Sequence, residues 1–396
     1  PSALPLEKLA PHKTRLARPW FHQKVHAQRI TNMAESNRRV LMSPDPLPDF
    51  QSPVCPVPIS RYDRIVLGHG SGGSLTRELI NRVFIPHFSN PALLAGNDFA
   101  ELSSQPGKRI VTSTDAHIVS PLFFPGGDIG RLAVSGTVND IAVSGGMPAF
   151  ITASFIIEEG FLISDLEKIV KSMAETALEA QVPIVAGDTK IVEKGKADGV
   201  FISTAGAAFA DDDLNIGGAN ARLGDVVLIS GTVGDHGIAV LSARGELGLS
   251  SDIHSDVAPL NHMIQAISSV TRDIHVLRDP TRGGLATTLN EIAEQSHVGI
   301  TIREELIPVR PAVAAACELL GFDPLYVANE GKIIIILPAE HSERVLAFIR
   351  ASRYGENAVF IGRVTSEHPG RVTLSTRVGG TRLLGMLSGE MLPRIC

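Results

Sequence analysis

Four acidic residues share one local setting along the chain. Each ends a predicted strand or begins a predicted helix beside glycine or another small residue. These residues are Asp115, Asp140, Asp188 and Asp279. Any one of them is equally well explained as a helix cap or a turn residue. Together, in a chain without a cysteine–histidine cluster, they indicate oxygen ligands for a hard cation such as Mg²⁺, which typically uses one or two carboxylates plus nucleotide phosphates.

Two further side chains have chemistry suited to phosphoryl transfer. Lys190 follows Asp188 closely and can neutralise the charge of a transferring phosphoryl group. Glu330 directly precedes a predicted buried strand, where loss of water would raise the pKa of its carboxyl toward that of a general base. A surface turn acid is the alternative for Glu330, so the pattern alone leaves its role open.

A glycine-rich loop lies between a predicted strand at residues 62–67 and a predicted helix that begins at residue 74. The loop consists of Gly68, His69, Gly70, Ser71, Gly72 and Gly73. Backbone N–H groups at the start of a helix favour an anion, so the loop either covers phosphates or is a plain tight turn. It is not a P-loop, because no Lys-Ser/Thr pair follows, and no strand ending in an acid follows about 20 residues later, as a dinucleotide fingerprint requires. We expect His69, and His236 in a second glycine loop, to make local hydrogen bonds rather than bind metal.

The chain ends on Cys396, after a glycine-rich stretch at residues 379–389. Glycine loosens the backbone and Pro393 stiffens the last step, which predicts a flexible arm with a thiol at its tip. The sulfur either carries a substrate or is incidental to a frayed terminus. The other cysteines are Cys55 and Cys317, the latter expected in a core. With no paired motif among them, they argue against a disulfide framework or zinc site and predict a reducing cytoplasm.

Strands and helices alternate along most of the chain, which predicts an α/β (α+β) fold with two domains, at residues 60–210 and 220–380. Residues 1–58 are basic, rich in proline and without apolar periodicity, so we predict disorder there. A targeting peptide and a cloning or gene-start extension are both open for this segment. Residues 381–396 form the predicted flexible tail that carries Cys396.

Composition excludes several classes of protein. The chain has 396 residues, of which 44% are hydrophobic, so two or three domains with large cores are expected. A net charge of −6 provides no basic footprint for nucleic acid. No apolar run of about 18 residues occurs, so we predict no membrane span. The 37 glycines cluster beside aspartates, which is typical of backbone that comes close to phosphate.

Several motifs, taken in order, give the chain a resemblance to a known family. They are GHGSGG at 68–73, PLFFPGGDIG at 121–130, ND at 139–140, GDTK at 187–190, GDHG at 234–237, RDPTRGG at 278–284, NEGK at 329–332 and the terminal PRIC at 393–396. On these motifs the chain, from about residue 60 to its end, resembles the HypE family of NiFe-hydrogenase maturation factors. The resemblance implies a two-domain fold like that of aminoimidazole ribonucleotide synthetase and selenophosphate synthetase. In that fold the N-terminal domains pair as a homodimer, and ATP lies in a cleft at their interface.

The resemblance also implies an activity. In this family the terminal cysteine receives a carbamoyl group from the carbamoyltransferase HypF, and HypE uses ATP to dehydrate the thiocarboxamide to a thiocyanate. The cyano group then passes to iron held by the HypC–HypD complex. The residue chemistry agrees with this, because phosphorylation turns an amide oxygen into a good leaving group and needs Mg-ATP, carboxylates and a lysine. Forming a nitrile also requires a base to remove the N–H protons.

The resemblance implies roles for particular residues. Glu330 would be the base, Lys190 its partner or a phosphate stabiliser, and Cys396 the carrier. The residues expected to hold Mg²⁺ are Asp115, Asp140 and Asp279, with Asp188 as a further candidate. Asn139, beside Asp140, and the loop at 68–73 are expected at the nucleotide.

Three other functions fit the sequence less well. A selenophosphate-synthetase-like kinase of a free small molecule would carry a reactive cysteine or selenocysteine near the glycine-rich loop, and the loop at 68–73 has none. A carrier scaffold that only holds the cyano precursor would bind its partners without turning over ATP. A dinucleotide-dependent oxidoreductase would need a ribose-binding acid that this chain lacks.

Overall fold

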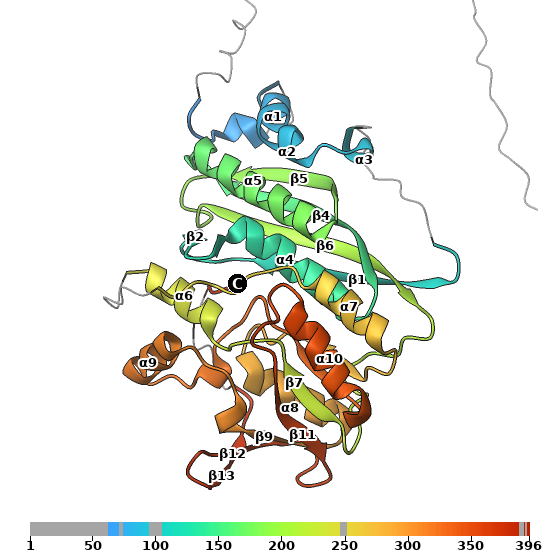
Figure 1. Ribbon diagram of the computed structural model, residues 1–396. Helices are drawn as coiled ribbons and strands as arrows, with labels where there is room; N and C mark the ends of the chain where they lie inside the picture. Colours follow the sequence, from blue (N-terminus) through green and yellow to red (C-terminus); the bar gives the residue numbers. More distant parts are fainter. Residues whose placement is uncertain (1–61, 71–73, 95–104, 246–251, 388–391, 393) are drawn as a thin grey trace, which may run out of the picture. The chain divides into compact units, whose positions relative to one another are not determined.

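The computed structural model describes residues 62–70, 74–94, 105–245, 252–387, 392 and 394–396, which belong to one compact unit (Figure 1). The predicted disorder at residues 1–58 lies outside the described residues, as do Ser71, Gly72 and Gly73 of the glycine-rich loop. No helix in the described part of the chain is long and apolar enough to cross a membrane.

The first half of the chain is built on a four-stranded sheet with the strand order β1-β6-β4-β5. Its strands are β1 (Lys108–His117), β4 (Met147–Glu158), β5 (Ile184–Val192) and β6 (Val200–Asp211). Strand β6 pairs antiparallel with β1 and β4, and β4 pairs parallel with β5. Burial alternates along most of β6, as expected of a strand with one covered face.

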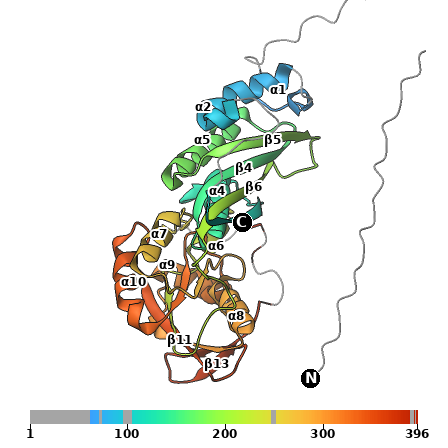
Figure 2. The ribbon, with the colours of Figure 1, turned by 90° about the vertical axis from the view of Figure 1, so that its right-hand side faces the viewer.

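Helices α4 (Ile129–Ala142) and α5 (Ile163–Ala180) cover one face of this sheet (Figure 2). Helix α4 begins where the side chain of Asp128 accepts hydrogen bonds from the backbone N–H groups of Gly130 and Arg131. The other face of the sheet, here called the open face, has exposed apolar side chains. They are Ile110, Met147 and Ile156.

The strand predicted at residues 62–67 is not formed. Arg64 makes a single bridge with Leu162, because the backbone of Ile65 bonds to a turn at residues 160–161 rather than to a strand. Leu67–Gly70 form a 3₁₀ turn, η2, which leads toward the first helices. These are α1 (Ser74–Leu79), η3 (Ile80–Phe84), α2 (Ile85–Phe88) and α3 (Pro91–Leu94). A short hairpin of β2 (Phe123–Phe124) and β3 (Gly127–Asp128) precedes α4.

The second half is built on a seven-stranded sheet with the order β13-β12-β9-β11-β7-β10-β8. Its strands are β7 (Val226–Ile229), β8 (Val276–Arg278), β9 (Gly299–Arg303), β10 (Ile334–Leu337), β11 (Val359–Thr365), β12 (Val372–Ser375) and β13 (Thr381–Leu384). The pairs are antiparallel except for β9 with β12. Strand β13 lies in the segment that the sequence analysis assigned to the tail, so the sheet extends to Leu384.

Helices pack on both faces of this second sheet. They are α8 (Gly284–Ser296) on one face and α7 (Asn261–Val270) with α10 (Ala339–Ala351) on the other. Helices α6 (Asp235–Ala243) and α9 (Pro311–Leu320) pack against each other, and η4 (Glu304–Leu306) and η5 (Pro324–Tyr326) are short turns. Ile334 and Ile336 of β10 lie in the core shared with α8, whereas Ile335 and Leu337 lie in the core shared with α7 and α10. Because alternate residues of a strand face opposite sides, a strand covered on both faces is apolar at every position.

Candidate active site

Acidic side chains from both halves of the chain lie close enough for their charges to interact. The acidic cluster comprises Asp115 on β1, Asp140 in α4, Asp256 before α7, Asp279 after β8 and Glu330 before β10. Burial and the charge of Asp140 raise the pKa of Asp279 to about 7. Burial also raises the pKa of Asp140, although Ser113 donates a 2.9 Å hydrogen bond to its Oδ2 atom. The structure therefore brings Asp115, Asp140 and Asp279 together, as their predicted shared role requires.

Glu330 is buried, with 5% of its surface exposed. Burial, followed by the charge of Asp279, raises the pKa of Glu330 well above its ordinary value. Its Oε1 atom has no hydrogen-bond partner among the described residues. A buried carboxyl with a raised pKa and an uncommitted oxygen is suited to acid–base chemistry. The alternative of a surface turn acid is therefore wrong.

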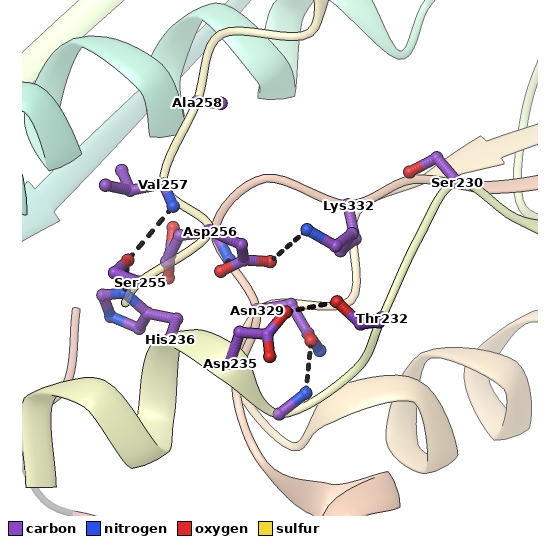
Figure 3. A network of polar contacts seen from close by, with 12 residues as sticks. Ser230, Thr232, Asp235, His236, Ser255, Asp256, Val257, Ala258, Asn329 and Lys332 are labelled. Atoms are coloured by element: carbon purple, nitrogen blue, oxygen red, sulfur yellow. Dashed lines mark hydrogen bonds and ion pairs between the residues drawn. The ribbon is translucent and has the colours of Figure 1, made fainter. Parts of the chain in front are cut away.

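Asp256 anchors the loop that carries Glu330. Its Oδ1 atom accepts a 3.1 Å hydrogen bond from the backbone N–H of Glu330, and its Oδ2 atom forms a 3.1 Å ion pair with Lys332 (Figure 3). Gly331 permits this approach, because an added Cβ would lie 1.8 Å from the backbone oxygen of Asp256. Sequence reasoning missed Asp256, since it lies outside any glycine loop or strand end that could have marked it.

Two buried asparagines join the loops around the cluster. Asn139 in α4 donates to the carbonyl of Ala258 at 3.0 Å and accepts the backbone N–H of Leu260 at 2.7 Å. Asn329 bonds the backbone of three further residues, which are Gly234, Pro280 and Val327. Because both groups of the Asn139 amide are used within the protein, its contact with a nucleotide stays a prediction. Asn329 was also missed, although its neighbour Glu330 was identified.

Asp188 and Lys190 lie on β5, away from the acidic cluster. Lys190 is opposite the exposed Ile156 in the strand register, so it lies on the open face of the sheet. Asp115 is opposite Thr204, whose hydroxyl donates to the backbone of α4 at 3.2 Å, so Asp115 lies on the covered face. The ammonium of Lys190 is exposed and pairs with Asp188 at 2.8 Å. Within one chain, these two residues therefore do not join the cluster.

The described part of the glycine-rich loop packs on β5. Gly68, His69 and Gly70 lie in η2, and an added Cβ at Gly70 would lie 2.8 Å from the side chain of Ile191. The Nδ1 atom of His69 accepts a 2.9 Å hydrogen bond from the backbone N–H of Val66, which confirms the predicted local hydrogen bond. Because the rest of the loop lies outside the described residues, its contact with phosphate stays a prediction.

The C-terminal residues pair with the segment that follows β1. The N–H of Ile118 donates to the carbonyl of Cys396, and the N–H of Ser120 donates to the carbonyl of Arg394, both at 3.2 Å. Ile395 is 4% exposed and Cys396 packs against the same core. These terminal residues are held rather than frayed. They place Cys396 along the continuation of the strand that carries one acid of the cluster.

The carboxylate oxygens of the acidic cluster are suitable ligands for a divalent cation that also has ligands from outside the protein. Within the described ranges, no group of three or more His, Cys, Asp or Glu side chains is arranged to hold a metal ion. The pKa of Asp279 is raised by burial first and then by the charges of Asp140 and Asp115, and this mutual repulsion of the carboxylates favours added positive charge. Mg²⁺ prefers oxygen donors and usually combines one or two carboxylates with substrate phosphates. The residues present therefore suit Mg²⁺ that arrives with a nucleotide, rather than an all-protein metal cage.

Two family models match the two halves of the chain. Residues 96–210 match the N-terminal domain of AIR synthase related proteins, and residues 222–375 match their C-terminal domain. The two halves are therefore the two domains of an AIR synthase related protein, and the predicted fold class is confirmed. A thiamine-monophosphate kinase from Stenotrophomonas maltophilia shares the fold, with a TM-score of 0.56 at 18% identity.

More similar proteins narrow this class. Carbamoyl dehydratase HypE of Cupriavidus necator is 53% identical over 333 residues, which cover 84% of this chain and 95% of the relative. The corresponding protein of Escherichia coli is 43% identical over 339 residues, covering 84% of this chain and 100% of the relative. A crystal structure of HypE in complex with ATP has a TM-score of 0.81 at 48% identity and covers 84% of this chain and 99% of its own. The chain belongs to the HypE family of carbamoyl dehydratases, as its motifs predict.

The chain is also similar to a family member whose structure was solved in a complex with another protein. The crystal structure of a HypE–HypF complex has a TM-score of 0.69 at 48% identity. It covers 80% of this chain and 100% of the solved one. This similarity extends over both halves of the described fold.

Proposed function

We propose that this protein uses ATP to dehydrate a carbamoyl group on the Cys396 sulfur to an S-cyanate, the source of the cyanide ligand of a hydrogenase iron centre. The observation that carries the proposal is the docked position of Cys396. Its carbonyl accepts the backbone N–H of Ile118, in the segment that directly follows the strand of Asp115. A chain end held against the segment that follows the strand of Asp115 is expected if chemistry is performed on a group that the Cys396 sulfur carries. The carbamoyl dehydratases at 53% and 43% identity support the same reaction.

The proposed reaction proceeds in two steps, phosphorylation of the amide oxygen and then elimination of phosphate. The amide oxygen of the S-carboxamide attacks the γ-phosphorus of ATP, ADP leaves, and the nitrogen gives up one proton to form a phosphorylated imidate. Loss of phosphate together with the second N–H proton then forms the C≡N bond. Glu330 is the proposed base, because a carboxylate with a raised pKa is a stronger proton acceptor than an ordinary glutamate.

ATP is proposed to bind with Mg²⁺ at the acidic cluster. Asp115, Asp140 and Asp279 would hold the metal ion, and Asp188 is a further candidate ligand. Bound Mg²⁺ would supply positive charge that neutralises the phosphates during transfer. The loop at 68–73 would cover the phosphates, and Asn139 would keep α4 and residues 258–260 in place beside them. The ATP complex of a related HypE supports a nucleotide here.

A homodimer is proposed through the open face of the first sheet. Ile110, Met147 and Ile156 are exposed on this face, and a second copy would remove that apolar surface from water. Lys190 and Asp188 lie on the same face. We therefore expect Lys190 to act on the phosphates, or with Glu330, only once the open face is covered by a second copy.

Two partners follow from the proposed reaction. HypF would load the carbamoyl group onto Cys396, and a solved complex of a related HypE with HypF supports this step. The HypC–HypD complex would accept the cyano group on its iron, which is a substrate of the sequence and not a resident metal. Cys396 must therefore leave its docked position before and after dehydration. A thiol that must stay reduced is consistent with the cytoplasm.

The deciding experiment separates loading from dehydration. The protein would be incubated with HypF, carbamoyl phosphate and ATP, and samples would be stopped at successive times. Intact-mass analysis of the C-terminal peptide is expected to show first the gain of one carbamoyl group and then the loss of one water. The Cys396→Ala variant is expected to show neither change.

Two other outcomes would overturn the proposal. A loaded peptide that never loses water would leave a carrier scaffold. ATP consumption with an unmodified Cys396 would favour a kinase of a free small molecule.

A further inference from the structure

The first turn of α6 forms a receptor for the C-terminal tail. The Nε2 atom of His236 lies 2.6 Å from the carbonyl oxygen of Ile395, the residue before the terminal cysteine. Gly237 provides room for Leu392, whose Cδ1 atom would lie 3.3 Å from an added Cβ. His236 is fully buried, and the ring of Phe124 packs against it edge to face with centroids 5.4 Å apart. The imidazole is therefore restricted to the orientation that meets the tail.

The chemistry of the partners defines where the protons lie. A carbonyl oxygen only accepts, so Nε2 of His236 carries the proton that it donates to Ile395. Burial lowers the pKa of His236, which favours the neutral ring with a single N–H. Its Nδ1 atom then accepts from the Ser255 hydroxyl at 2.8 Å, and the Ser255 oxygen accepts the backbone N–H of Val257 at 3.1 Å. These bonds form one directional chain from Val257 to the tail, whose first members are drawn in Figure 3.

The same turn, at residues 255–257, holds the candidate base. Asp256 lies between Ser255 and Val257 in sequence, accepts the backbone N–H of Glu330 and pairs with Lys332. One side of this turn therefore contacts the tail through His236, and the other side contacts the loop of Glu330. A tail docked on His236 is thus positioned against the same short segment that positions the base.

We infer that His236, oriented by Ser255, is a positioning residue that holds the loaded tail at the site during dehydration. The claim that Cys396 carries a carbamoyl group during this step rests on the proposed function. The docking of the tail on His236 does not, because it is a contact in the structure. Because the tail is an intramolecular substrate, its docked fraction multiplies the dehydration rate and leaves ATP binding unchanged. The tail must also undock to reach HypF, so weaker docking is expected to slow dehydration without slowing loading.

Two amide substitutions separate the two hydrogen bonds of the ring. In His236→Gln the amide N–H takes the place of Nε2 and retains the bond to Ile395. In His236→Asn the shorter side chain retains only the bond to Ser255. Loss of one such bond shifts the docking equilibrium about 3- to 10-fold. We expect His236→Asn to slow single-turnover dehydration by up to this factor with an unchanged KM for ATP, and His236→Gln to stay near the wild-type rate.

Docking can also be measured without activity, as the rate of alkylation of Cys396 in the unloaded protein. His236→Asn is expected to raise this rate, and its fold-increase multiplied by the fold-loss in dehydration should be about 3- to 10-fold, because both rates follow one docking equilibrium. His236→Gln is expected to leave the alkylation rate near wild type. Cys317 is an internal reference, because burial raises the pKa of its thiol to about 11 and leaves little thiolate, as expected of a core cysteine. His254→Asn is the matched control, since His254 is exposed beside the turn and bonds only locally, to the backbone of Asp252.

Equal alkylation rates in wild type, His236→Asn and His236→Gln would overturn the inference. A wild type that does not dehydrate, with alkylation rates that still separate the variants, would overturn the proposed function and leave the docking role intact. If His236→Asn unfolds, Ser255→Ala takes its place, because it keeps the ring and removes the donor to Nδ1 together with the acceptor of the Val257 N–H. A folded Ser255→Ala variant with wild-type alkylation and dehydration rates would also overturn the inference.

Discussion

Lys332 and Asp256 form an ion pair of 3.1 Å whose side chains are 8% and 2% exposed. Burial opposes the ionisation of Asp256, but the Lys332 ammonium and the other neighbours of the carboxylate together outweigh burial and hold the pKa of Asp256 below its usual value. Because Asp256 also accepts the backbone N–H of Glu330, this pair holds the loop of the candidate base in place. The pair joins two segments that are far apart in the sequence.

Removing one partner of this pair is expected to destabilise the fold. Lys332→Met should lower the free energy of unfolding by about 3–5 kcal/mol, because it leaves the Asp256 carboxylate buried without its counter-charge. Urea denaturation measures the change. The matched control is Lys190→Met, which removes an exposed ion pair with Asp188 and should cost less than about 1 kcal/mol. Similar losses of unfolding free energy in the two variants would show that burial does not increase the contribution of the Lys332–Asp256 pair to stability.

Glu330→Gln tests the proposed base while keeping the size of the side chain. The variant is expected to accept the carbamoyl group normally and to lose dehydration by about 10²- to 10⁴-fold, because an amide cannot take up the N–H proton. Mass analysis of the loaded C-terminal peptide over time measures both steps. Thermal stability should not fall, since the substitution removes a buried acid repelled by Asp279. Dehydration at the wild-type rate would exclude Glu330 as the base.

Asp279 is expected to make stability depend on pH in the absence of nucleotide. Burial and the charge of Asp140 raise its pKa from 3.8 to about 7, so the folded protein retains a proton that the unfolded chain has released. The stability that this group contributes is complete below about pH 4 and is lost as the pH rises through about 7. Asp279→Asn removes this loss, so its Tm should exceed that of the wild type by a few degrees at pH 8 and by less at pH 5.

The same variant tests the metal site. Mg-ATP should raise the Tm of Asp279→Asn less than that of the wild type, because a ligand that binds only the folded state stabilises it in proportion to its affinity. Thermal unfolding with and without Mg-ATP measures this difference. An equal shift in both proteins would argue against Asp279 as a ligand.

Ile110→Asp tests the proposed homodimer. Ile110 is 67% exposed on the open face, and a charge there should prevent a second copy from packing. Light scattering is expected to show a dimer for the wild type and a monomer for the variant. Leu178→Asp is the control, because Leu178 is 79% exposed on α5, which covers the other face of the sheet. A dimer that survives Ile110→Asp would move the interface elsewhere.

Contiguous patterns in the sequence predicted the fold well. The isoleucine run at residues 333–336 indicates a buried strand, and three of its four residues lie in β10, where alternating side chains meet a core on each face. The strand expected at 62–67 is wrong, because Ile65 meets a turn and not a strand, and no local pattern distinguishes these partners. The short apolar stretch is compatible with both.

The residues of the candidate site likewise divide into those with a local signal in the sequence and those without one. Glu330 and Asp279 carry local signals, since each stands at the end of a strand or the start of a helix. Asp256 and Asn329 carry none that we recognised, and the partner of His236 is 159 residues away in the sequence. A residue that acts by joining distant segments has no short-range signature.

The sequence by itself determined the α/β class, the membership in the HypE family and the candidates for the reactive groups, because strand periodicity, glycine–aspartate loops and a terminal cysteine are all contiguous features. The tertiary structure decided which groups meet. It gathers Asp115, Asp140, Asp279 and Glu330, leaves Lys190 on the opposite face of the sheet, and docks the tail on His236. The physical reason is that burial and the charges of neighbours, which raise the pKa of Asp279 and Glu330, exist only after the chain has folded.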